Sequence, residues 1–199
     1  MDIAIIKYNA GNIFSVEHAF KRLGVDAVVT EDKELIKKAD KVIFPGVGGE
    51  ASTTMDYLRR SGFADLIPDL KQPVLGICLG MQLMCSYSEE GDADCLNIFD
   101  APVKRFIPQK QEDKVPHMGW NNIMDVKSAL FDQSLEDQFV YFVHSYYVPV
   151  TNDTIATTNY IQPFSAALHK DNFYATQFHP EKSGSVGERI LKNFLSNTK

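Results

Sequence analysis

The first half of the chain alternates short apolar runs with segments of helical periodicity. Four apolar runs predict buried strands, at 3–8, 26–30, 41–46 and 73–78. Helical patterns follow these runs, at 12–23, 34–39, 55–60 and 80–87. Strands that alternate with helices and are apolar at nearly every position indicate a parallel sheet whose two faces are both covered.

From about residue 95 the pattern changes to strand-like segments with few helices between them. These segments lie at 103–107, 139–150, 154–160, 165–170 and 173–178. They suggest antiparallel hairpins appended to the sheet, before an amphipathic helix at 186–195. No repeat, low-complexity tract or linker divides the sequence. We therefore expect residues 1–199 to form a single α/β domain with a mixed sheet.

Composition excludes several classes of protein. Twenty Lys and Arg against 26 Asp and Glu give a net charge of −6, which argues against nucleic acid or an anionic membrane as the main partner. The N-terminus lacks the positive charge of a signal peptide, and the longest apolar stretch is shorter than a membrane span. A soluble, cytoplasmic protein is expected. The three cysteines form no C-x-x-C pair, so we expect no disulfide framework, no metal and no cofactor.

The strongest local signal for chemistry is GICLG at 76–80, which has a G-x-nucleophile-x-G form with Cys78 as the nucleophile. It lies between a predicted strand and a predicted helix, where a sharp turn needs small neighbours and exposes the nucleophile at the sheet edge. The helix start favours a thiolate, and the N–H of Leu79 is free to donate to an oxyanion. The alternative is a buried structural cysteine on a glycine-flanked strand.

A nucleophilic cysteine needs a base, and the best candidate is His179 in the sequence His179-Pro180-Glu181. Proline keeps this segment extended, so residues 179 and 181 point to the same side. Glu181 can then bond one imidazole nitrogen and leave the other facing a thiol, as in hydrolytic triads. The alternative is a strand-end histidine followed by a solvated glutamate.

The segment GVGG at 46–49 follows the third predicted strand and permits three interpretations. Its backbone N–H groups could line a site beside Cys78, because parallel strands present their carboxyl ends at one edge. Gly46, Gly48 and Ala51 also fit a dinucleotide fingerprint, although the next strand ends in Cys78 rather than in an acid for the ribose. The third interpretation is an ordinary turn.

Further polar groups for a small substrate could come from the segment 144–147 and from Gln82 and Glu90 near the helix after Cys78. Periodicity does not decide this point. Aromatic strand residues that pack in a core, and a solvated helix end at Glu90, are the alternatives.

Three of these motifs together resemble the triad-type (class I) glutamine amidotransferases: GICLGMQ at 76–82, PGVG at 45–48 and FHPE at 178–181. More narrowly, four segments look like the glutaminase subunits of imidazole glycerol phosphate synthase in histidine biosynthesis. They are YNAGNIFSV at 8–16, VPHMGWN at 115–121, YFVHSYYV at 141–148 and FHPEKSG at 178–184. The similarity covers essentially the whole chain. It implies a three-layer, flavodoxin-like fold with a mostly parallel central sheet and appended antiparallel strands.

The resemblance also implies a catalytic role for each matching residue. Cys78 is expected to attack the side-chain amide of glutamine and form a γ-glutamyl thioester, with His179 as general base and acid and Glu181 orienting it. The oxyanion hole is expected from the backbone N–H of Leu79 and one N–H from the loop of Gly46, Val47 and Gly48.

Two further sets of residues follow from the resemblance. Contacts to glutamine are expected from Gln82, Glu90, Ser145 and Tyr146. The face toward a partner is expected to include Asn12, Trp120 and Lys182. The segment GDADC at 91–95 lacks the glycine-rich stretch of many family members, which leaves the loop there undefined.

Ammonia released into neutral water is mostly protonated and no longer nucleophilic, so a synthase must transfer it under cover. In the family the acceptor enzyme is a separate (β/α)₈ cyclase, which implies a heterodimer and a glutaminase that this partner stimulates. The alternatives are a glutaminase for another acceptor, a γ-glutamyl cysteine hydrolase, a nucleotide-binding oxidoreductase that uses the 46–49 loop, and a noncatalytic scaffold with the same fold.

Overall fold

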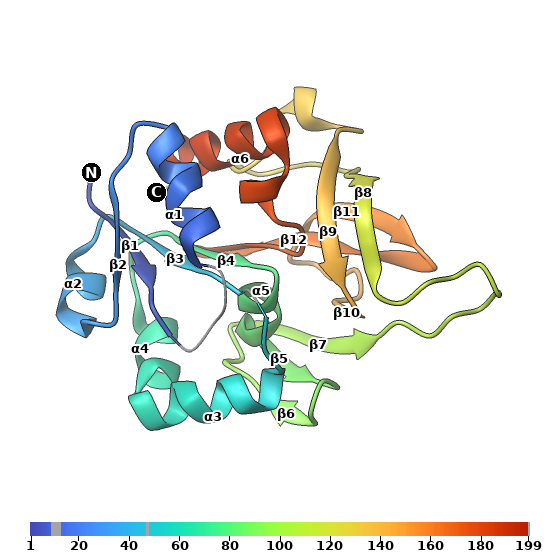
Figure 1. Cartoon of the computed structure of the whole chain (residues 1–199), viewed down its shortest axis with the longest axis horizontal. Helices are drawn as coiled ribbons and strands as arrows, with labels where there is room; N and C mark the ends of the chain where they lie inside the picture. Colours follow the sequence, from blue (N-terminus) through green and yellow to red (C-terminus); the bar gives the residue numbers. More distant parts are fainter. Residues whose placement is uncertain (9–12, 47, 199) are drawn as a thin grey trace.

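Five parallel strands form the centre of the computed structural model, which describes residues 1–8, 13–46 and 48–198. Two antiparallel strands extend this sheet at one edge (Figure 1). In spatial order the strands are β11 (Thr154–Tyr160), β12 (Gln162–Lys170), β13 (Phe173–Thr176), β4 (Val74–Ile77), β3 (Lys41–Phe44), β1 (Ile3–Ile6) and β2 (Ala27–Thr30). The mixed, mostly parallel sheet that the sequence predicts is confirmed.

Helices cover both faces of this sheet, as Figure 1 shows. One face packs against α1 (Ile13–Arg22) and α6 (Gly184–Asn197). The other packs against α2 (Lys33–Lys38), α3 (Ala51–Ser61), α4 (Phe63–Asp69) and α5 (Leu79–Met84). The result is the three-layer arrangement expected of a parallel sheet.

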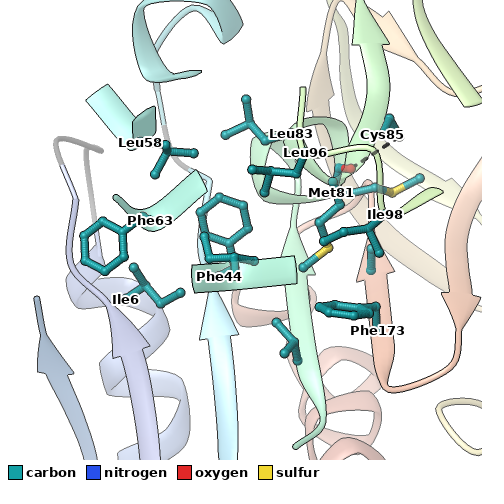
Figure 2. Packing of buried hydrophobic residues seen from close by; sticks show 14 of the residues in the cluster. Ile6, Phe44, Leu58, Phe63, Met81, Leu83, Cys85, Leu96, Ile98 and Phe173 are labelled. Carbon is teal, nitrogen blue, oxygen red and sulfur yellow. Dashed lines mark hydrogen bonds between the residues drawn. The ribbon is translucent and has the colours of Figure 1, made fainter. Parts of the chain in front are cut away.

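The alternation of side chains along β1 explains why the apolar run is continuous. Ile3 and Ile5 point into the core with α1 and α6, while Ala4 and Ile6 point into the opposite core. Figure 2 shows Ile6 in that second core, beside Phe63 of α4. Because successive strand residues face opposite sides, a strand buried on both faces needs an apolar residue at every position.

The second half of the chain builds two smaller sheets beside the central one. One has the order β10 (Tyr146–Tyr147), β7 (Phe99–Arg105), β5 (Cys85–Ser88) and β6 (Ala93–Asp94). The other is a hairpin of β8 (His117–Asn122) and β9 (Phe139–His144). Two short 3₁₀ turns, Gln133–Leu135 and Pro180–Lys182, complete the described elements. Across the described ranges, no helix combines the length and apolar character that a bilayer crossing requires.

The structure corrects the expected helix at 80–87. The helix α5 ends at Met84, and Cys85 begins strand β5. The backbone N–H groups of Leu96 and Ile98 donate hydrogen bonds to the carbonyls of Leu83 and Met84, respectively. In addition, β5 pairs with β7. These contacts with residues more than ten positions away override the local helical pattern.

Other elements also differ from the prediction, among them the short strand β6 and strand β7, which begins at Phe99 rather than at residue 103. The strand β8 was not predicted because it is short and lacks a clear apolar period. The helix α4 was not predicted although Phe63, Leu66 and Ile67 have helical spacing, because it is only seven residues long and contains Pro68. Strand β13 is not only an arm of an antiparallel hairpin: it also pairs in parallel with β4 and so belongs to the central sheet. This last pairing positions the functional site.

Candidate functional site

Cys78 lies at the carboxyl end of β4, on the turn that leads into α5. Its backbone has φ 52° and ψ −106°, a region that residues with a side chain rarely occupy. Such strain persists only where the surrounding structure holds it, and it is the geometry of a nucleophile elbow. The side chain is partly exposed, and its Sγ lies 3.8 Å from the carbonyl oxygen of Val143.

Glycines allow the elbow to pack tightly against the end of β3. A Cβ on Gly80 would lie 2.2 Å from the carbonyl oxygen of Phe44, and one on Gly46 would lie 2.2 Å from the N of Gly80. A Cβ on Gly76 would lie 2.8 Å from the sulfur of Met84. Gly46 therefore has a packing function, because the lack of a side chain there lets the 46–49 loop lie against the nucleophile turn.

His179 and Glu181 follow β13, the parallel neighbour of β4. The imidazole Nδ1 of His179 lies 2.8 Å from Oε1 of Glu181, and both side chains are almost fully buried. Strand β9 holds the backbone here, because the N–H of His179 donates to the carbonyl of Tyr141 at 2.9 Å. The hydroxyl of Ser183 donates to the carbonyl of His179 at 2.6 Å and accepts from the N–H of Tyr141 at 3.0 Å.

The electrostatics of His179 link it to both neighbours. Burial by itself lowers the pKa of His179, but the charge and hydrogen bond of Cys78 and those of Glu181 outweigh it and raise the pKa well above its usual value. Within the described residues, Oε2 of Glu181 has no hydrogen-bond partner. The thiol, the imidazole and the carboxylate thus form one connected unit.

Cys78 and His179 line a cavity of about 320 Å³, and Glu181 lies buried behind His179. Eight further residues that the sequence analysis named also line this cavity: Gly46, Gly48, Leu79, Gln82, Glu90, Ser145, Tyr146 and Lys182. They come from the carboxyl ends of β3 and β4, from α5, and from the segments after β5, β9 and β13. This volume is at the small end of the range for ligand pockets, which suits a single amino acid.

Comparison with known proteins places this geometry in a family. The sequence model for "Glutamine amidotransferase class-I" matches residues 4–198. Two proteins named imidazole glycerol phosphate synthase subunit HisH are similar over 98% of this chain and 99% of their own length. The one from Bacteroides thetaiotaomicron is 69% identical and the one from Bacteroides fragilis 71%. The chain belongs to the class-I glutamine amidotransferases, in their HisH family.

The fold agrees with this assignment. A crystal structure of a glutamine amidotransferase superposes with a TM-score of 0.73 at 19% identity, over 96% of each chain. The HisH relatives and the family model show that the chain is an enzyme of this family.

The side-chain amides of Gln82 and Gln177 form hydrogen bonds around the nucleophile elbow. The amide nitrogen of Gln82 donates to the carbonyl of Tyr146 at 3.1 Å and to Oε1 of Gln177 at 3.0 Å, so Gln82 braces the pocket wall. The amide nitrogen of Gln177 donates to Sγ of Cys78 at 3.7 Å. Sequence reasoning missed Gln177. Its position two residues before His179, near the end of the predicted strand at 173–178, was the available signal.

Glu90 also lines the cavity and lies in the turn after β5 rather than at the end of a helix. Its Oε2 accepts the backbone N–H of Ala51, the first residue of α3, at 3.2 Å. Burial raises the pKa of Glu90, the bond from Ala51 lowers it, and Glu50 raises it further. Burial raises the pKa of Cys85 and also raises that of Cys95 to about 12, which disfavours a thiolate at either position.

The residues expected at the partner face lie in different settings. Trp120 on β8 is 55% exposed and meets the ring of Tyr141 edge to face, with 6.0 Å between centroids. Lys182 is exposed and lies at the rim of the cavity. Asn12, and Val47 of the expected oxyanion hole, lie outside the described residues.

Proposed function

We propose that Cys78, His179 and Glu181 are the catalytic triad through which this enzyme hydrolyses L-glutamine to L-glutamate and ammonia. The observation that carries the proposal is that Cys78, on a strained elbow, and His179 line one cavity, while His179 is bonded to the buried Glu181. A hydrogen-bonded nucleophile, base and orienting carboxylate is the arrangement that covalent hydrolysis requires.

In the first half-reaction, Sγ of Cys78 attacks the side-chain amide carbon of glutamine. His179 accepts the thiol proton and gives it to the leaving nitrogen, so the C–N bond breaks and ammonia departs. In the second half-reaction, water attacks the γ-glutamyl thioester while His179 takes a proton from it. Return of that proton to sulfur releases glutamate and restores Cys78. Glu181 stabilises the imidazolium in both halves.

Each half-reaction passes through an oxyanion that needs hydrogen-bond donors. Leu79 is the first residue of α5, so its N–H has no acceptor within the helix and can serve the oxyanion. The loop of Gly46, Val47 and Gly48 supplies the second donor in this proposal. Its contact with the elbow through Gly46 supports that role.

The polar walls of the cavity would hold the α-amino and α-carboxylate groups of glutamine. We assign these contacts to Glu90, Gln82 and the backbone of Ser145 and Tyr146, all of which line the cavity. The carboxylate of Glu90 suits an ammonium group, because an opposite charge offsets the cost of its partial burial.

We infer that residues 1–199 act as one glutaminase domain in the cytoplasm, in a heterodimer with a cyclase of barrel fold. The relatives are named as subunits of imidazole glycerol phosphate synthase, which supports a partner that uses the ammonia to make imidazole glycerol phosphate. The exposed Trp120, together with Asn12 and Lys182, would face this partner.

Replacement of Cys78 distinguishes its role in glutamine hydrolysis from any role in the synthesis that the partner carries out. In the complex with the cyclase, Cys78→Ala should abolish synthesis that depends on glutamine while added ammonium still supports it. The matched control is Cys85→Ala, which removes a buried thiol outside the cavity and should keep the glutamine-dependent reaction.

A second measurement covers the alternatives. An electrophile that mimics glutamine should modify Cys78 alone and should not label Cys78→Ser. Labelling of another residue, or loss of the ammonium-dependent reaction in Cys78→Ala, would show that Cys78 is structural. Glutamine hydrolysis without any stimulation by the cyclase would instead indicate a different acceptor.

A further inference from the structure

Two buried histidines outside the triad lie between the hairpin β8–β9 and the cavity. His117 on β8 is 4% exposed, and His144 at the end of β9 is 6% exposed. Nδ1 of His117 lies 2.9 Å from Nε2 of His144, and His144 lines the cavity. Buried polar side chains are costly unless paired, so this contact needs an explanation.

The outer bonds of the pair fix which nitrogens carry protons. Nδ1 of His144 lies 2.7 Å from the carbonyl oxygen of Tyr146, which can only accept, so this nitrogen is the donor. In a neutral ring Nε2 of His144 then accepts from Nδ1–H of His117. The remaining Nε2 of His117 accepts from the side-chain amide of Asn121 at 3.4 Å. The hydrogen bonds thus run in one direction, from Asn121 to Tyr146.

Burial keeps both rings neutral, as this arrangement requires. It lowers the pKa of His117 to about 4. Burial is also the largest effect on His144, whose pKa falls to about 3 although the bond to Tyr146 opposes this change. The neighbouring His117 and His179 lower the pKa of His144 further. The ring of His117 stacks on that of Tyr160, with 4.0 Å between centroids, which fixes its orientation.

The hydrogen bonds of Asn121, His117 and His144 end on the backbone carbonyl of Tyr146, which accepts two hydrogen bonds. The oxygen of Tyr146 accepts from His144 and also from the amide of Gln82. Ser145 lies between His144 and Tyr146 in the chain, and its own carbonyl accepts the N–H of Phe106 at 3.0 Å. The backbone of residues 145 and 146 is therefore fixed where it borders the cavity.

We propose that His117 and His144 are positioning residues for glutamine: their directed hydrogen bonds hold the 145–146 backbone in the geometry that binds the substrate. This inference rests on the proposed glutaminase function. It assigns the pair no contact with the reacting atoms, so its loss should weaken substrate binding more than it slows the chemical step.

The test compares two substitutions of the same ring. His117→Phe preserves an aromatic ring for stacking but removes the donor to His144. His117→Asn keeps a donor at the position of Nδ1. Because a buried acceptor is left unpaired, His117→Phe should raise the KM for glutamine about 5- to 100-fold, with kcat within about twofold of the original. His117→Asn should recover most of that KM.

Three results would overturn the proposal: an unchanged KM in His117→Phe, a loss confined to kcat, or an equal rise of KM in both variants, which would assign the effect to packing. Failure of the unaltered enzyme to hydrolyse glutamine would instead refute the proposed function. Alkylation of Cys78 by iodoacetamide should proceed at the same rate in His117→Phe, since the elbow is untouched.

A measurement on the unaltered protein keeps the proposal testable if His117→Phe does not fold. Nitrogen NMR of ¹⁵N-histidine-labelled protein should show both rings neutral and protonated on Nδ1 from about pH 6 to 8. A charged ring, or a proton on Nε2 of His144, would contradict the direction of these hydrogen bonds.

Discussion

The contact between Gly80 and the end of β3 gives a sharp test of how the elbow is built. In Gly80→Ala the new Cβ would lie 2.2 Å from the carbonyl oxygen of Phe44 and 3.2 Å from its carbon. Non-bonded carbon and oxygen atoms need more than about 3 Å, so the elbow and the loop after β3 must separate by about 1 Å. Both neighbours are backbone, so no side-chain rotation relieves the clash.

Two opposing effects set the stability of this variant. Alanine in place of glycine within a helix gains about 1 kcal/mol, while overpacking of a tight contact costs about 1–3 kcal/mol. The free energy of unfolding should therefore fall by no more than about 2 kcal/mol. A displacement of about 1 Å between reacting groups can cost about 100-fold in rate. We expect kcat to suffer far more than the fold.

Urea denaturation measures the stability of Gly80→Ala, and the glutaminase assay with the partner measures its kcat. The matched control is Gly24→Ala, where no atom lies within 4 Å of the new Cβ but the backbone has φ +76°. Its left-handed conformation costs alanine about 1–2 kcal/mol, far from the cavity. Wild-type kcat in Gly80→Ala, or the same loss of kcat in Gly24→Ala, would refute the reasoning.

Three other substitutions test the same site. Glu181→Gln should lower the raised pKa of His179 and reduce kcat about 10²–10⁴-fold. In urea titrations, its loss of stability relative to the original enzyme should be largest below about pH 6.5 and should shrink as the pH rises through the raised pKa of His179. Tyr8→Phe removes the hydroxyl that donates to the carbonyl of Pro45, and should cost about 1 kcal/mol with a lower kcat at unchanged KM. Gly187→Ala would place a Cβ 1.9 Å from the proline carbonyl between His179 and Glu181, so kcat should fall although alanine favours the helix; unchanged kinetics would exclude that contact.

The central sheet could be predicted from the sequence because its strands are buried on both faces. A run such as 3–6 is apolar at every position, and the helices between runs carry an apolar face and a glycine after the last turn, as at Gly24. These signals are local, so a single sequence contains them. The elbow was visible for the same reason, since its glycines lie next to Cys78.

Strands β5 and β8, which were not predicted, depend on distant contacts. Strand β5 forms because β7 pairs with it, and β8 forms because β9 lies opposite, with paired residues 17 to 27 positions apart. The partnership of His117 and His144 has the same origin, because the register of that hairpin places the two residues directly opposite each other. Neither residue has a local pattern that marks it as one of a pair.

The register of β13 against β4 is the feature on which the site depends. Thr176 pairs with Ile77, so the next residues of the two strands, Gln177 and Cys78, leave the sheet side by side. Past the end of β13 the chain bends at Gln177 and Phe178, and both Gln177 and His179 lie at the thiol: the amide of Gln177 donates to Sγ of Cys78, and His179 lines the same cavity. A slip of one residue would turn both side chains to the other face of the sheet, away from the thiol. Almost complete burial of β13 on both faces resists such a slip, so core packing fixes the distance between nucleophile and base across a hundred residues of chain.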